Sequence, residues 1–91
     1  CEKNGIKCWV GSRLESAVGA SFLKALSTLS NIAYPNDIFP SSRFYVDDLG
    51  TPEIELSGPS EMTLFEEPGC GASPEPELLE RYTVERAVVR P

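Results

Sequence analysis

The sequence predicts an α+β fold, in which one long and one short helix lie on one face of an antiparallel sheet. Two observations support this prediction. A helical apolar pattern extends over residues 12–31 with a second helix signal at 73–81, and short alternating segments lie around them. A helix has to bury its apolar stripe against another element, and a sheet with one apolar face can receive it. Ninety-one residues suffice for one such core, so we expect a single domain over residues 1–91.

The long helix is predicted from a stripe of apolar residues at helical spacing. The stripe consists of Leu14, Val18, Phe22, Ala25, Leu26 and Leu29. Ser12 followed by Glu15 has the spacing of a capping box, so we expect the helix to begin there. Asn31 can end the helix in a left-handed conformation, and Pro35 prevents it from resuming.

Four short segments, 6–10, 43–47, 53–56 and 62–65, alternate between apolar and polar residues, as strands with one buried face do. A fifth strand is predicted over 82–89, because Thr83, Val84, Val88 and Val89 favour β structure, although this segment also fits a helical face. Turn residues separate the middle three segments, which are therefore expected to form a meander. The core prediction is that Phe22, Leu26 and Leu29 pack on Ile6, Val10, Phe44, Val46, Ile54 and Leu64.

A short helix is predicted after the meander. Ser73 can cap it, Pro74 suits its first position, and acidic residues follow in the first turn up to an end near Arg81. The resulting order is strand, helix, three strands, helix and strand, which resembles the split β-α-β sandwich of ferredoxin-like folds. Because that fold supports unrelated functions, it predicts none here.

The charge of the chain is unevenly distributed. The formal net charge is −6; residues 1–43 carry five basic and three acidic side chains, and residues 44–91 carry three basic and eleven acidic ones. An acidic half repels phosphate, so nucleic acid is not an expected partner. A solvated surface that keeps a small protein in solution is the simpler interpretation of the charge.

Three cysteines in so short a chain suggest an oxidising compartment. The chain begins at Cys1 without a Met or an apolar leader, as a secreted protein would after removal of a signal peptide. We expect a secreted, extracellular protein with a Cys8–Cys70 disulfide, because Cys8 faces inward and Cys70 ends the meander. The alternatives are Cys1–Cys70, Cys1–Cys8 and no bridge. An unpaired Cys1 would permit a homodimer or a second chain. No apolar run is long enough for a membrane span.

Histidine and several motifs that carry enzyme chemistry are absent. The chain has no histidine, its cysteines have no C-x-x-C spacing, and no glycine-rich phosphate loop occurs. Paired carboxylates could hydrolyse glycosides, and the candidates are Asp47, Asp48, Glu53, Glu55, Glu66 and Glu67. A glycosidase needs a deep cleft, for which this chain leaves little room. We therefore expect no enzyme, no catalytic residue, no metal ligand and no cofactor.

Two aromatic residues are candidate binding anchors. Trp9 and Tyr45 alternate out of phase with the apolar faces of their segments, and exposed aromatic residues are enriched among interface hot spots. The alternative is that a second layer, or the loop at 34–42, covers Trp9. These two residues are the predicted contact set for a protein target.

Two segments resemble known families. The sequence from Asp47 to Thr51 is similar to the start of the calcium loop of βγ-crystallins, but Pro52 stands where a serine belongs, and a plain β-turn is the simpler interpretation. Residues 62–70 are similar to the strand and turn that open the Greek keys of that family. This resemblance covers under a third of the chain and does not include the helix.

The small, acidic, cysteine-containing chain also resembles secreted fungal effectors and killer toxins. That resemblance implies a non-enzymatic interaction module that binds a protein of a host or competitor. The alternatives are an intracellular acidic regulatory domain with free thiols, a calcium-binding βγ-crystallin-like domain, or a small carboxylate hydrolase, which would show a bell-shaped pH–rate profile.

Overall fold

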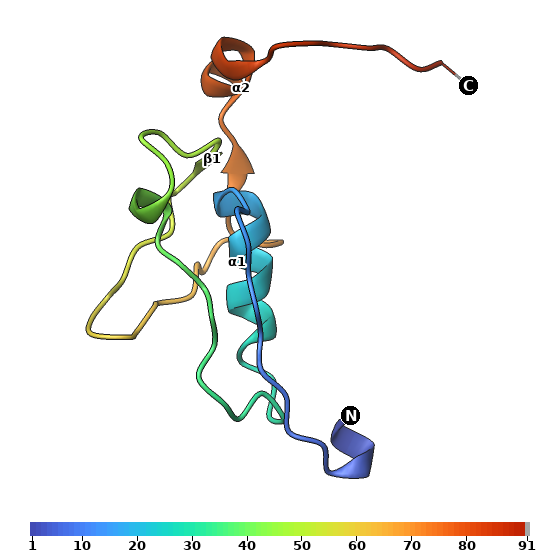
Figure 1. The fold of residues 1–91 in the computed structure, drawn as a ribbon, viewed down its shortest axis with the longest axis vertical. Helices are drawn as coiled ribbons and strands as arrows, with labels where there is room; N and C mark the ends of the chain where they lie inside the picture. The colour runs from blue at the N-terminus through green and yellow to red at the C-terminus, as the bar shows by residue number, and fades with distance from the viewer. Residues whose placement is uncertain (91) are drawn as a thin grey trace.

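One α-helix occupies the middle of the molecule, with the rest of the chain arranged around it. The computed structural model describes residues 1–90. Its elements are a short 3-10 helix at Glu2–Asn4, α1 at Ala17–Leu26, a 3-10 turn at Ser41–Arg43, β1 at Gly50–Thr51, β2 at Ser73–Pro74 and α2 at Pro76–Tyr82. Figure 1 shows α1 along the long axis, with the N-terminal turn at one end of the molecule and α2 at the other.

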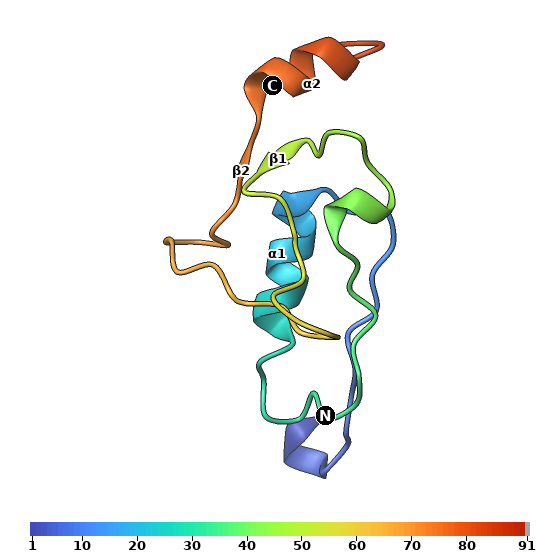
Figure 2. The ribbon, with the colours of Figure 1, turned by 90° about the vertical axis from the view of Figure 1, so that its left-hand side faces the viewer.

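The α+β class is confirmed in outline, because two α-helices accompany an antiparallel sheet. The sheet consists of β1 and β2 alone, with Gly50 opposite Pro74 and Thr51 opposite Ser73. Figure 2 shows this pair next to the start of α1. Gly50 permits the close approach, since a Cβ atom there would lie 3.0 Å from the Val18 side chain. The ferredoxin-like arrangement is not confirmed, because the predicted meander strands do not pair with one another within residues 1–90.

The predicted first strand makes bridges instead of a continuous ladder. The Cys8 N–H donates to the Asn31 carbonyl at 2.8 Å, and the Cys8 carbonyl accepts from the Ala33 N–H at 3.1 Å. Further on, the Val10 carbonyl accepts from the Asp37 N–H at 2.9 Å. The N-terminal segment therefore runs parallel to the chain that follows α1, and the loop after α1 supplies its partner.

α1 is shorter than predicted at both ends. It begins at Ala17 instead of Ser12 and ends at Leu26. The capping-box prediction is wrong, because Glu15 accepts a hydrogen bond from the Arg13 N–H at 2.5 Å before the helix begins. Local spacing thus identified a helix but not its first residue.

The buried face of α1 is the opposite of the predicted one. Ala17, Ala20 and Ser21 are buried, and with Ile54 the two alanines form the core cluster, covered in part by Met62 and Phe65. Apart from Val18, which is half-buried beside Gly50, the predicted stripe faces outward. Its large members Leu14, Phe22, Leu26 and Leu29 are exposed, Phe22 by 61% and Leu26 by 46%.

Most of the predicted sheet partners of that stripe are exposed as well. Val10 and Ile54 are buried, whereas Ile6, Phe44, Val46 and Leu64 are not. The core prediction is therefore wrong for the stripe, since periodicity identifies an apolar face without identifying what covers it.

The predicted short helix is present and ends one residue beyond Arg81. Glu75 precedes its first residue, Pro76, so the helix begins later than the predicted Ser73 cap. Residues 83–90 then extend away from α2, as Figure 1 shows, and the predicted last strand does not form within the described chain. No helix in residues 1–90 combines the length and apolar character that crossing a membrane requires.

Candidate functional site

A buried carboxylate holds the start of α1. Asp48 is 2% exposed. Its Oδ1 accepts from the Ala17 N–H at 2.7 Å and from the Gly50 N–H at 3.0 Å, and its Oδ2 accepts from the Ser41 hydroxyl at 2.6 Å. The first N–H groups of a helix have no partner within the helix, and the helix dipole favours a negative charge there. Asp48 therefore caps the start of α1, whereas the sequence predicted Ser12 for this role.

Ser41 extends this network to the core. Its hydroxyl oxygen accepts from the Ile54 N–H at 2.9 Å, and its own N–H donates to the Ile54 carbonyl at 2.8 Å. The Asp48–Ser41 network thus joins α1, the 3-10 turn, β1 and the segment at Ile54. Buried polar groups that are fully hydrogen-bonded fix one arrangement of the elements around them.

Tyr45 holds the segment that precedes α1. Its hydroxyl donates to the Leu14 carbonyl. Burial raises the pKa of Tyr45, and the charges of Asp48 and Glu15 raise it further. Tyr45 is half-buried, whereas Trp9 is 57% exposed. The expected exposure is thus observed for Trp9; a binding role for either residue stays a prediction.

Lys24 lies between two hollows on the side of α1 that faces the rest of the chain. The hollows measure about 810 and 350 Å³, and both are lined by Lys24, Leu56 and Leu64. Lys24 is 4% exposed, and its Nζ lies 3.4 Å from the centre of the Phe65 ring. Burial lowers the pKa of Lys24. The ring face stabilises the ammonium in place of a carboxylate.

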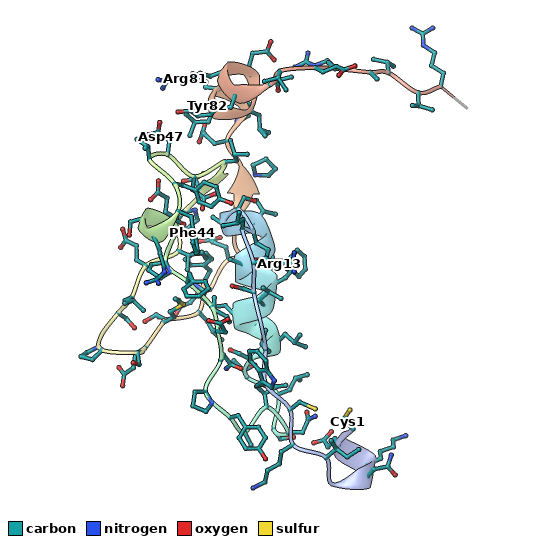
Figure 3. The ribbon with its side chains drawn as sticks, viewed as in Figure 1. Cys1, Arg13, Phe44, Asp47, Arg81 and Tyr82 are labelled. Carbon is teal, nitrogen blue, oxygen red and sulfur yellow. The ribbon has the colours of Figure 1, made fainter. Side chains whose placement is uncertain are left out.

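A second polar contact joins α2 to the loop before β1. The Tyr82 hydroxyl donates to Asp47 Oδ2 at 2.9 Å, and Arg81 Nη1 lies 3.8 Å from the same oxygen. Figure 3 shows these three side chains together at one end of the molecule. The bond to Asp47 raises the pKa of Tyr82. Because the pair is exposed, it positions α2 without contributing much stability.

The three cysteines are unpaired, so the predicted Cys8–Cys70 bridge does not form. Cys8 contacts Ile6 and Asn31, whereas the Cys70 thiol donates to the Ala72 carbonyl at 3.1 Å. Hydrogen bonding to the sulfur by the Ala72 main chain and by the Ser21 side chain lowers the pKa of Cys70. Figure 3 places Cys1 at the N-terminal turn, away from the labelled groups around Asp47. The two predicted bridge partners thus face different neighbours.

No cluster that could hold a metal ion occurs among residues 1–90. The calcium alternative for Asp47 and Asp48 gains no support, because the oxygens of Asp48 already accept three hydrogen bonds and Asp47 faces Tyr82. The residues that sequence reasoning missed are Ser41 and Lys24. Lys24 could have been found as a candidate, because it is the one charged residue in the otherwise uncharged sequence of α1. Nothing in the sequence around Ser41 indicated its buried hydrogen bonds.

The chain is similar to bacterial enzymes. It is 35% identical over 83 residues to an o-succinylbenzoate synthase from Geobacillus stearothermophilus and 37% identical over 83 residues to an N-succinylamino acid racemase from Amycolatopsis. The aligned part is 91% of this chain but only 22% of either relative. No protein-family model matches the chain.

A solved structure shows the same fold within a longer chain. A member of the enolase superfamily from Listeria innocua matches with a TM-score of 0.77 and 31% identity, over 85% of this chain and 20% of that one. The chain therefore spans about one fifth of the length of the proteins it matches.

These findings correct the functional expectations. The resemblance to fungal effectors and killer toxins is wrong, because the relatives are bacterial. The expectation of a non-enzymatic module is wrong because the relatives are named as enzymes. The expectation of a secreted protein is wrong because the relatives are bacterial metabolic enzymes. The expected disulfide, a main argument for export, is absent from the described residues. Most of this chain is thus similar to a segment of bacterial enzymes of the enolase superfamily, and that segment is about one fifth of the length of each enzyme.

Proposed function

We propose that this chain is a structural segment of an enzyme of the enolase superfamily with o-succinylbenzoate synthase or N-succinylamino acid racemase activity. The observation that carries the proposal is 35–37% identity over 83 of the 91 residues to proteins with those two names. The structural match at a TM-score of 0.77 supports the superfamily named in the proposal. Both names contain a succinyl group, which belongs to the product of the synthase and to the substrate of the racemase.

The geometry assigns this segment a supporting role. Racemisation requires a group that removes a proton and a group that returns it, each within reach of the reacting carbon. Among residues 1–90, the two buried charged side chains are Asp48 and Lys24. Asp48 is occupied by three hydrogen-bond donors, and Lys24 faces the Phe65 ring. We therefore assign the reacting groups to the four-fifths of such an enzyme that this chain does not span.

The segment would then form a rigid part of the surroundings of the catalytic site. Residues 1–91 would act as one unit, in which the Asp48–Ser41 network and the Tyr45 bond to Leu14 hold the segment before α1 in one position. Positions held by packed and hydrogen-bonded neighbours are what a catalytic site requires of its surroundings.

A segment exchange tests the proposal. The matched segment of the Geobacillus stearothermophilus synthase is replaced by the aligned residues of this chain. The chimera is then assayed for o-succinylbenzoate formation by mass spectrometry and for racemisation of an N-succinylamino acid by chiral chromatography. We expect the chimera to retain at least one activity, within about a hundredfold of the parent enzyme, because side-chain differences in a supporting segment displace the site only slightly.

The control is the parent enzyme with this segment deleted, which should be inactive. A chimera that unfolds cooperatively, has the circular dichroism of the parent and yet shows neither activity would contradict the proposal.

A further inference from the structure

Lys24 carries a buried positive charge that has no anionic partner. The residue is 4% exposed, and no ion pair or side-chain hydrogen bond among residues 1–90 includes its ammonium. Every fully enclosed side-chain nitrogen or oxygen of the described residues does have a hydrogen-bond partner. The Lys24 Nζ is therefore not fully enclosed, and it reaches the hollows that Lys24 lines. A buried charge without a partner costs stability, so its presence calls for another explanation.

The larger hollow beside Lys24 has the size and lining of a small-molecule site. It measures about 810 Å³, within the roughly 300–1,000 Å³ typical of ligand pockets. Ile38, Phe39, Met62 and Leu64 give it an apolar wall. An apolar wall with a few polar groups, one of which has a shifted pKa, is the usual composition of a binding site. All the lining residues lie within 24–28, 35–40 and 56–64, so this chain forms the hollow by itself.

The acidic residues near Lys24 limit the charge of an occupant. Asp37 and Glu61 line the larger hollow, and Glu53 and Glu55 line the smaller one. All four are exposed and hydrated, whereas Lys24 is buried. Because a charge interacts more strongly away from water, Lys24 dominates the field close to its ammonium. One negative charge placed there is favoured, and further charges on the same molecule would be repelled by the exposed carboxylates.

We propose that the hollow beside Lys24 binds a small molecule with one carboxylate and an apolar body. The carboxylate accepts a hydrogen bond from the Lys24 ammonium, and the body lies against the apolar wall. A charge-assisted bond of this kind is stronger than a neutral one, and it removes the cost of leaving the ammonium unpaired. The inference does not depend on the proposed function, because it uses residues of this chain that have no part in the reaction.

The experiment titrates the chain with 3-phenylpropionate and with 3-phenylpropionamide, a neutral compound of the same shape. Met62 is the single methionine and lines the hollow, so its labelled methyl signal in an NMR spectrum reports occupancy. Trp9 is the single tryptophan and lines neither hollow, so its indole signal is an internal control. We expect the carboxylate to shift the Met62 signal and to bind at least about tenfold more tightly than the amide, with the Trp9 signal unchanged.

Two lysine variants test the role of the charge. Lys24→Met replaces the ammonium by an unbranched apolar side chain, and Lys7→Met is the matched control at an exposed position outside both hollows. Lys24→Met should weaken the binding of the carboxylate by about tenfold or more and that of the amide by less than about threefold, which would show that the hollow is intact. Lys7→Met should change neither affinity by more than about threefold.

The same titrations are made by calorimetry on the segment-exchange chimera and its two lysine variants. The test then does not require the 91-residue chain to fold alone, and it includes the polypeptide that surrounds this segment. Binding of 3-phenylpropionate to the chimera that Lys24→Met weakens about tenfold and Lys7→Met does not would support the proposal.

Three results would overturn it. They are equal affinities for the carboxylate and the amide, equal effects of Lys24→Met and Lys7→Met, and carboxylate binding to the isolated chain that the chimera lacks. The third result would assign the hollow to the surrounding polypeptide. Because synthase and racemase activities are measured separately, a chimera without either activity that still binds the carboxylate through Lys24 would contradict the proposed function and support this site.

Discussion

Replacing Asp48 by alanine tests whether the buried network determines where α1 begins. The substitution removes the acceptor for three donors, namely the Ala17 and Gly50 N–H groups and the Ser41 hydroxyl. Each hydrogen bond to a charged group contributes about 1.5–3 kcal/mol, and the desolvation of the carboxylate offsets part of the sum. We therefore expect Asp48→Ala to lower the free energy of unfolding by about 3–5 kcal/mol, because it leaves three donors without an acceptor and each unsatisfied buried donor costs about 1–3 kcal/mol.

The measurement is urea unfolding followed by circular dichroism at 222 nm, which also reports any loss of the first turn of α1. Asp47→Ala is the matched control, because Asp47 is the neighbouring acid and contacts only the exposed Tyr82 and Arg81 side chains. It should cost less than about 1 kcal/mol. An unfolding midpoint for Asp48→Ala equal to that of Asp47→Ala would refute the assignment of Asp48 as the cap.

Three further predictions concern glycine, lysine and cysteine. Gly69 and Gly71 have similar positive φ angles of 77° and 74°, but a Cβ atom at Gly71 would lie 2.3 Å from Phe65 Cβ, whereas one at Gly69 meets nothing within 4 Å. Thermal melting should therefore show a cost of about 1 kcal/mol for Gly69→Ala and at least twice that for Gly71→Ala, and equal costs would contradict the packing. Lys24→Met should stabilise the chain by about 1 kcal/mol at pH 7, because it removes a buried charge. Since burial lowers the pKa of Lys24 in the folded state, the unfolded chain binds more protons below pH 10.5. The stability of the parent should therefore rise as the pH increases toward 10.5, and its difference from Lys24→Met should narrow; a constant difference would contradict the burial. Thiol titration without a reductant should count three reactive groups per denatured chain, and a lower count would show a disulfide that the structure lacks.

The two helices were predictable because their signals are local. Apolar spacing and helix-forming residues identified α1, and a proline near the first position identified α2. The first residue of α1 was not predictable by the same means, because its cap, Asp48, lies 31 residues further along the chain. A spacing rule for helix ends covers only a few residues.

The burial pattern failed for a different reason. Alternation in segments such as 43–47 indicates one apolar face, and the stripe on α1 indicates another, but neither pattern identifies its partner. The expected packing of these two faces against each other does not occur, since Phe44 and Phe22 are both exposed. The similarity to bacterial enzymes was not predicted from the sequence, because this chain spans only 22% of the length of those relatives.

The extended segment after α2 affects how the chain associates with other polypeptides. Residues 83–90 present main-chain N–H and carbonyl groups without a strand partner, and Val84 and Val89 are fully exposed. Such a segment can template the addition of another strand. Glu85 and Arg86 interrupt its apolar residues, so no uncharged run reaches the five to seven residues typical of aggregating sequences. Copies aligned in parallel and in register would also bring their Glu85 side chains together. The segment therefore favours pairing with a strand of different sequence over self-association, and added salt, which screens the repulsion, weakens that preference.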